Sequence, residues 1–101
     1  MKTRLEIKKK IAEILLDHQW VKPGEEVHER HSYMDDYGMD SLDCIEMIMD
    51  LEKEYGIFIP DDVAERMDTV ARTIDYIHQQ LNNYGNEQNR NPTAAAGLPP
   101  Q

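Results

Sequence analysis

Apolar residues recur at helical intervals in three stretches of the chain, and glycine and proline fall outside these stretches. The first runs roughly from Arg4 to Asp17 and the last from Thr69 to Leu81, with Thr69 or Asp68 as the cap. In both, spacings of three, four or seven residues predict a helix with one buried face. The predicted core positions are Ile7, Ile11, Ile14 and Leu15 in the first helix and Val70, Ile74, Ile77 and Leu81 in the last.

The middle stretch, Ser41 to Tyr55, carries the clearest helix signals. Asp40 suits the N-cap, Asp43 occupies the third helical position of an acidic capping box, and Gly56 ends the helix. One apolar stripe predicts the core-facing side, and it consists of Cys44, Met47, Ile48, Leu51 and Tyr55.

A second apolar stripe on the same helix comprises Leu42, Ile45 and Met49. It is offset from the first stripe and lies close to the start of the helix. A small bundle does not need both stripes for its core. The additional apolar arc is therefore a candidate for contact with a partner or with a buried guest chain.

The connections complete the predicted fold. A long loop from His18 to Asp40 contains Pro23, Gly24 and Gly38, and it must pack in places because it also carries Trp20, Val27, Tyr33 and Met34. Pro60 suits the first position of a helix of one or two turns within residues 59–67. With no strand pattern, the fold class is all-α: a small four-helix bundle with a short third helix and a long first loop.

The composition changes after the last helix. Residues 83–101 are dominated by Asn, Gln, Gly, Pro and Ala, which is typical of a disordered tail. We therefore predict two regions, a folded domain over residues 1–82 and a disordered C-terminal tail over residues 83–101.

Charge narrows the choice of partners. The formal net charge is −9, and residues 35–68 hold twelve acidic residues against only Lys53 and Arg66. This excess argues against nucleic acid or an anionic membrane and favours basic protein surfaces.

No apolar run is long enough to span a bilayer. A single cysteine, Cys44, excludes an internal disulfide and a cysteine zinc cluster, and is typical of a cytoplasmic protein. We predict no metal site.

Ser41 is the residue with the most distinctive chemical position. It would occupy the first helical position, where free N–H groups and the helix dipole favour a phosphate bonded to its side chain. A plain helix-start serine is the common alternative. A nucleophilic serine would need a base, an oxyanion hole and an α/β scaffold that 101 residues without strands do not offer. A calcium loop with Gly38 at its sixth position places Tyr33 and Tyr37 at ligand positions, so its register fails.

Several motifs together resemble those of the acyl carrier proteins. They are Asp36-Tyr37-Gly38-Met39-Asp40-Ser41-Leu42-Asp43, Glu46-Met47-Ile48-Met49-Asp50-Leu51-Glu52, Ile59-Pro60-Asp61, Thr69-Val70 and Ile74-Asp75-Tyr76-Ile77. The resemblance covers roughly residues 4–82 and is most specific at 36–61. It implies a non-enzymatic carrier that holds acyl groups as thioesters for fatty-acid or related biosynthesis.

The resemblance also implies a cofactor and partners. Ser41, flanked by Asp40 and Leu42, would carry 4′-phosphopantetheine, transferred from coenzyme A by a phosphopantetheinyl transferase. A monomeric carrier would dock on basic patches of synthases, reductases, dehydratases and transferases. The partner-binding residues implied are Asp43, Ile45, Glu46, Met49, Glu52, Ile59, Asp61 and Glu65.

Three departures from the typical fatty-acid carrier keep alternatives open. The first loop is longer by about five residues, Lys53 interrupts the acidic run, and Tyr37 replaces an aliphatic residue before Gly38. A specialised carrier for polyketide or modified-lipid synthesis is one alternative. An unmodified acidic interaction module with the same fold is another. A small hydrolase that uses Ser41 is disfavoured for the reasons above and would require turnover by the isolated protein.

Overall fold

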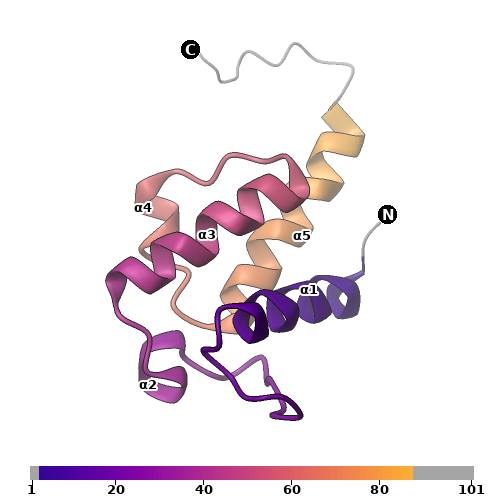
Figure 1. The fold of residues 1–101 in the computed structure, drawn as a ribbon. Coiled ribbons are helices and arrows are strands. Elements are labelled where there is room, and N and C mark those ends of the chain that lie inside the picture. The colour runs from indigo at the N-terminus through magenta and orange to yellow at the C-terminus, as the bar shows by residue number, and fades with distance from the viewer. Residues whose placement is uncertain (1–2, 88–101) are drawn as a thin grey trace.

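The computed structural model describes residues 3–87 of the chain, and these form an all-α fold (Figure 1). Three longer helices account for most of the structure, and two short helices lie in the connections. The helices are α1 (Arg4–Asp17), α2 (Tyr33–Tyr37), α3 (Ser41–Tyr55), α4 (Asp61–Ala64) and α5 (Val70–Glu87). None of the described helices is long and apolar enough to cross a bilayer.

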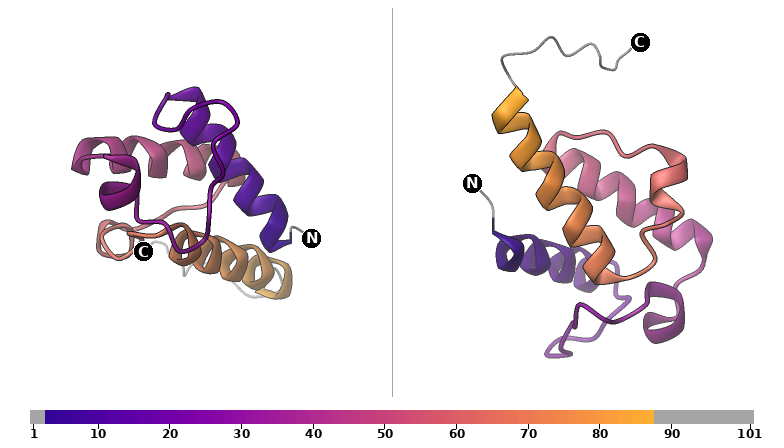
Figure 2. Two further views of the ribbon diagram at one scale, coloured as in Figure 1. Left: turned by 90° about the horizontal axis from the view of Figure 1, so that it is seen from below. Right: turned by 180° about the vertical axis from the view of Figure 1, so that it is seen from behind.

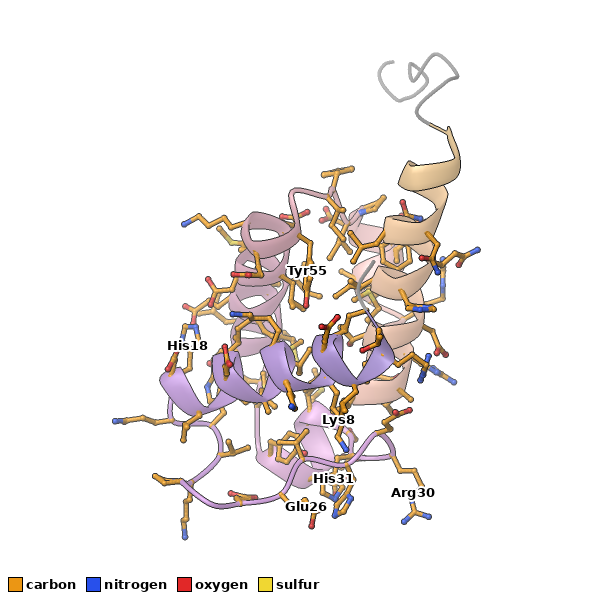
Figure 3. The ribbon with its side chains drawn as sticks, turned by 90° about the vertical axis from the view of Figure 1, so that its right-hand side faces the viewer. Lys8, His18, Glu26, Arg30, His31 and Tyr55 are labelled. Carbon is orange, nitrogen blue, oxygen red and sulfur yellow. The ribbon has the colours of Figure 1, made fainter. Side chains whose placement is uncertain are left out.

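Helix α1 packs against both α3 and α5 and closes one side of the bundle (Figures 2 and 3). The buried side chains match the predicted stripes closely. In α1 the buried residues are Ile7, Ile11, Ile14 and Leu15, as predicted, and in α5 they include Val70, Ile74 and Ile77. In α3, Met47, Ile48 and Leu51 are buried, while Cys44 and Tyr55 pack partly buried against them. The all-α prediction is confirmed.

Side-chain caps define where the long helices begin. The predicted box at the start of α3 is present, and Gly56 ends that helix with a left-handed φ of 64°. Of the two candidate caps for α5, Thr69 does the capping, because its hydroxyl accepts the Arg72 N–H at 3.2 Å. At α4, Pro60 is the N-cap residue and Asp61 is the first helical residue, so the predicted placement of Pro60 at the first helical position is off by one residue.

The long first loop contains a helix that the sequence pattern missed. The prediction of loop throughout residues 18–40 is wrong for α2, which spans five residues. Its caps are clear: the Ser32 hydroxyl accepts the Asp35 N–H, and Gly38 ends the helix with a φ of 69°. A helix of little more than one turn shows no apolar period, so only these caps could have revealed it.

Helix α5 is longer than predicted. The expected end at Leu81 is too early, because the helix continues through Glu87. The first five residues of the predicted tail, 83–87, are therefore helical. The remainder, residues 88–101, lies outside the described residues, so the two-region division stays a prediction.

Hydrogen bonds tie α2 to the start of α5. The Tyr33 backbone N–H donates to the Asp68 carbonyl at 3.2 Å, and the Val70 N–H donates to the His31 carbonyl at 3.1 Å. The Tyr33 side chain is fully buried, and its hydroxyl donates to Thr73 Oγ1 at 2.7 Å. Burial raises the pKa of Tyr33, so the phenol stays protonated and serves as a donor. The first loop is thereby fixed to α5.

We expect Tyr33 and Thr73 to be energetically coupled. Tyr33→Phe removes one buried hydrogen bond and should lower the free energy of unfolding by about 1 kcal/mol. Thr73→Val leaves the buried phenol unpaired and should cost about 1–3 kcal/mol. Urea unfolding of both variants and of the double variant measures the coupling. The double variant should lose less than the sum of the two single losses; strictly additive losses would contradict the pairing.

Candidate functional site

The start of α3 is fixed by a reciprocal pair of hydrogen bonds. Asp40 Oδ1 accepts the Asp43 N–H at 2.9 Å, and Asp43 Oδ2 accepts the Asp40 N–H at 3.1 Å. Because both caps come from these aspartates, the helix start does not need the side chain of Ser41. Ser41 follows the N-cap directly as the first helical residue.

The Ser41 side chain is exposed at this helix start. Within the described residues its hydroxyl makes no hydrogen bond, and neither do the backbone N–H groups of Ser41 and Leu42. Two free amides and the positive end of a 15-residue helix form a favourable setting for a phosphate ester. The residues present therefore fit a phosphodiester-linked group on Ser41.

An apolar groove begins beside Ser41. Its volume is about 710 Å³, and it lies between α3 on one side and α2, α4 and the segment before α5 on the other. Its apolar lining comprises Tyr33, Met34, Cys44, Ile45, Ile48, Met49, Phe58, Ile59, Ala64 and Met67. Acidic residues border it: Asp35, Glu52, Asp61, Glu65 and Asp68. A groove of this size with an apolar lining suits a flexible hydrocarbon chain.

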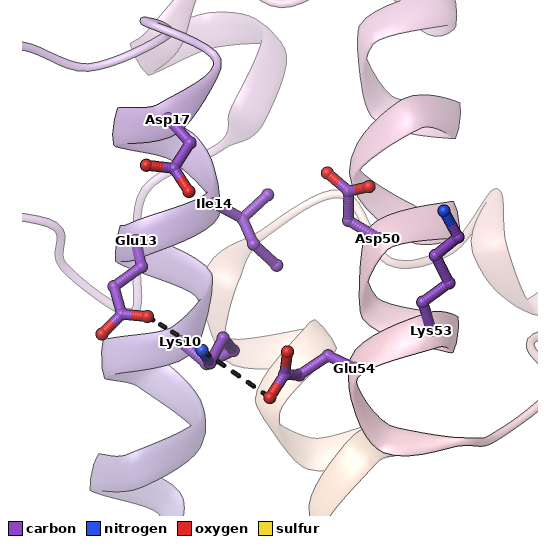
Figure 4. A pocket seen from close by; sticks show the side chains of 7 residues that line it. All are labelled: Lys10, Glu13, Ile14, Asp17, Asp50, Lys53 and Glu54. Atoms are coloured by element: carbon purple, nitrogen blue, oxygen red, sulfur yellow. Dashed lines mark ion pairs between the residues drawn. The ribbon is translucent and has the colours of Figure 1, made fainter.

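A second hollow, between α1 and α3, differs in chemistry (Figure 4). It measures about 310 Å³, and Ile14 is the only apolar residue among the seven that line it. Lys10 crosses it and pairs with Glu13 at 2.9 Å and with Glu54 at 3.6 Å. Charged walls of this kind do not favour an apolar guest, so the groove beside Ser41 is the candidate site.

The predicted partner-binding residues do not all share one surface. Exposed side chains around the groove include Ile45, Glu46, Met49, Asp61 and Glu65, together with Leu42 next to Ser41. Asp43 is half-buried because its carboxylate caps the helix.

Two of the predicted residues face inward. Ile59 is only 3 % exposed, so its predicted place on the docking surface is wrong, and its side chain lines the groove instead. Glu52 is half-buried, and its Oε2 accepts the Ile59 N–H at 2.7 Å. The cause is the backbone of residues 57–59, which turns back over the end of α3 and takes Ile59 inward.

Two exposed apolar residues at the groove escaped the sequence prediction. Phe58 is 72 % exposed and Met34 is 50 % exposed, and both line the groove. Phe58 belongs to no helical stripe because it lies in the connection between α3 and α4. The available signal was a large aromatic residue just before the Ile59-Pro60 pair.

Cys44 brings a thiol into the groove lining, one turn from Ser41. Burial, and then the negative charges of Asp43 and Asp40, raise the pKa of this thiol above its ordinary value. The raised pKa keeps the thiolate fraction small near neutral pH. Cys44 is therefore a weak nucleophile near neutral pH.

None of the four histidines lines the groove, and His18 and His31 are labelled in Figure 3. His18 stacks on Trp20 with ring centroids 4.3 Å apart, and its Nε2 lies 2.7 Å from Asp50 Oδ2. His31 Nδ1 lies 2.6 Å from the Tyr37 hydroxyl, and burial raises the pKa of Tyr37 to about 12. No group of three His, Cys, Asp or Glu side chains within the described part of the chain could hold a metal ion.

Residues 6–77 match the family described as the phosphopantetheine attachment site, which is a class of carrier proteins. The acyl carrier protein of Zymomonas mobilis subsp. mobilis is 43 % identical over 70 residues, which cover 69 % of this chain and 88 % of that protein. The acyl carrier protein of Porphyromonas gingivalis is 41 % identical over 76 residues, covering 75 % and 96 %. This chain belongs to the acyl carrier protein family, whose members are carriers rather than catalysts.

We expect Cys44 to react slowly with alkylating agents because its pKa is raised. The rate of iodoacetamide alkylation of the folded protein, followed against pH, should have its midpoint above that of a cysteine in an unstructured peptide. Asp43→Asn removes one of the charges responsible and should shift the midpoint down. A midpoint at or below that of the peptide would contradict the environment assigned to Cys44.

Proposed function

We propose that Ser41 is the residue to which 4′-phosphopantetheine is attached, and that the protein carries acyl groups for fatty-acid or related biosynthesis. The observation that supports this most is the exposed Ser41 hydroxyl, which the helix does not use, beside a groove of about 710 Å³. When bound, the group supplies a terminal thiol on which acyl groups are held as thioesters.

The residues around Ser41 would each contribute to holding that group. The free N–H groups of Ser41 and Leu42 would stabilise the negative charge of the phosphodiester. The Asp40 and Asp43 carboxylates are engaged with backbone N–H groups, which offsets part of their repulsion of that charge. Asp40 thus acts through the helix start, whereas Leu42 would contact the group or its transferase.

The groove gives a physical reason for an acyl chain to fold against the protein. Each methylene removed from water is worth about 0.8 kcal/mol, so a chain of several carbons gains enough to compete with the exposed state. Met49 and Met34 at its edge are pliable side chains that can adjust to chains of different shape. The same burial would shield the cargo while the carrier moves between enzymes.

The surface around the groove supports docking on basic partners. Exposed acids, among them Glu46, Asp61 and Glu65, lie beside exposed Ile45 and Met49. Charge would accelerate encounter and fix orientation, and the apolar side chains would anchor the contact. The partners proposed are a phosphopantetheinyl transferase and acyl-processing synthases, reductases, dehydratases and transferases. The single cysteine, Cys44, supports a reducing cytoplasmic setting.

Intact mass before and after incubation with coenzyme A and a promiscuous phosphopantetheinyl transferase tests the proposal. The protein should gain one phosphopantetheine, or be isolated already heavier by that mass. Ser41→Ala should show neither.

A matched control keeps the test specific. Ser32→Ala removes the other serine hydroxyl of the groove lining, which is partly buried and caps α2, and this variant should still be modified like the parent protein. Failure of the parent to gain mass, under conditions that modify another acyl carrier protein, would favour the unmodified interaction module. A mass gain that persists in Ser41→Ala would place the attachment elsewhere.

A further inference from the structure

The segment between α3 and α4 is held against α3 by one side-chain hydrogen bond. Glu52 Oε2 accepts the Ile59 backbone N–H at 2.7 Å in a partly buried setting. Ile59 lies outside any helix, so helical bonding does not serve its N–H. A carboxylate is a strong acceptor, and a buried amide left without one is costly. This bond therefore fixes the backbone at Ile59.

Fixing Ile59 also sets part of the groove. The side chain of Ile59 is buried and lines the groove, whereas its neighbour Phe58 lines it from an exposed position. On its other side the segment is held more loosely, by a long hydrogen bond of 3.5 Å from the Tyr76 hydroxyl to the Phe58 carbonyl. The Glu52 bond is thus the shorter of these two attachments.

Glu52 lies at the far end of the groove from the attachment serine. It follows Ser41 by eleven positions on α3, which corresponds to about 16 Å along a helix at 1.5 Å per residue. Both residues line the same groove. The Glu52 bond therefore acts where the distal part of a bound chain would lie.

We propose that Glu52 is a positioning residue that shapes the acyl groove, and that its carboxylate closes the far end by holding Ile59 and Phe58 against α3. This inference rests on the proposed function for its acyl cargo, but the structural step can be measured without any cargo. The positioning role of Glu52 differs from a docking role in what it requires. Positioning needs a hydrogen-bond acceptor at position 52, whereas docking needs a negative charge there.

Two substitutions separate these roles. Glu52→Gln keeps an acceptor oxygen and removes the charge, and Glu52→Ala removes both. Glu46, an exposed acid on the same helix, provides the matched control as Glu46→Gln and Glu46→Ala. Urea unfolding and circular dichroism verify that each variant is folded.

The first readout is hydrogen exchange of the Ile59 amide in the unmodified protein, measured by NMR. Loss of one net hydrogen bond should raise the exchange rate about fivefold in Glu52→Ala. Glu52→Gln should stay within about twofold of the parent, because a neutral acceptor remains. The Glu46 variants should leave the rate unchanged. Equal acceleration in Glu52→Gln and Glu52→Ala, or in neither, would overturn the proposal.

The second readout uses protein loaded with a decanoyl or an acetyl thioester. Cleavage by hydroxylamine, followed by intact mass, reports how well the groove shields the thioester. Decanoyl-loaded Glu52→Ala should be cleaved about fivefold faster than the parent, and Glu52→Gln within about twofold of it. Acetyl-loaded forms should all react alike, because acetyl has no chain to bury. An equal decanoyl rate in Glu52→Ala and the parent would overturn the proposal.

The two readouts keep this inference distinct from the proposed function. If Ser41 cannot be loaded, the proposed function fails while the exchange experiment on Ile59 still tests the positioning role. If loading succeeds and the hydrogen-exchange rate of the Ile59 amide is unchanged in Glu52→Ala, the carrier function stands and the positioning role fails.

Discussion

The reciprocal capping of α3 by Asp40 and Asp43 is the interaction on which the site depends. Each aspartate accepts the backbone N–H of the other, so the first turn is fixed without help from Ser41. The serine is left with a free hydroxyl at the positive end of a helix, next to an apolar groove. One local arrangement would thus supply both the anchor for the proposed arm and its electrostatic setting.

Helix α3 contributes to both the core and the groove, through two different sides. Its buried side, with Met47 and Leu51, joins the core against α1, and its other apolar arc, with Ile45 and Met49, forms a wall of the groove. The opposite wall comes from short pieces, α2, α4 and the segment before α5, which backbone hydrogen bonds hold together. A rigid helix therefore faces a wall made of several short segments. Such a construction would suit the proposed binding of chains of different length.

The sequence predicted the parts of the fold that depend on period and capping. The three long helices and most of their buried residues follow from apolar spacing, because burial of one helical face dictates that spacing. The box at Asp40 follows from the residue types at its two positions. The second apolar arc of α3 is exposed, as a stripe without a core partner should be. It therefore pointed to the side on which the groove lies.

The features that were not predicted depend on how the connections fold back. Helix α2 is too short to show a period, and its docking depends on Tyr33 reaching Thr73, forty residues away in sequence. Ile59 and Phe58 are adjacent apolar residues, yet one is buried and the other exposed. That difference is set by the turn after Gly56 and by the hydrogen bond that the Ile59 N–H donates to Glu52, and neither residue composition nor helical spacing encodes it.

The most direct test of the account is the location of an acyl chain on the loaded protein. Nuclear Overhauser contacts from the terminal methyl of an octanoyl group report which side chains it meets. The account predicts contacts with groove residues, Ile48 and Met49 among them, and none with Ile14 in the charged hollow between α1 and α3. A methyl group that contacts Ile14, or that meets no side chain of the protein, would contradict it.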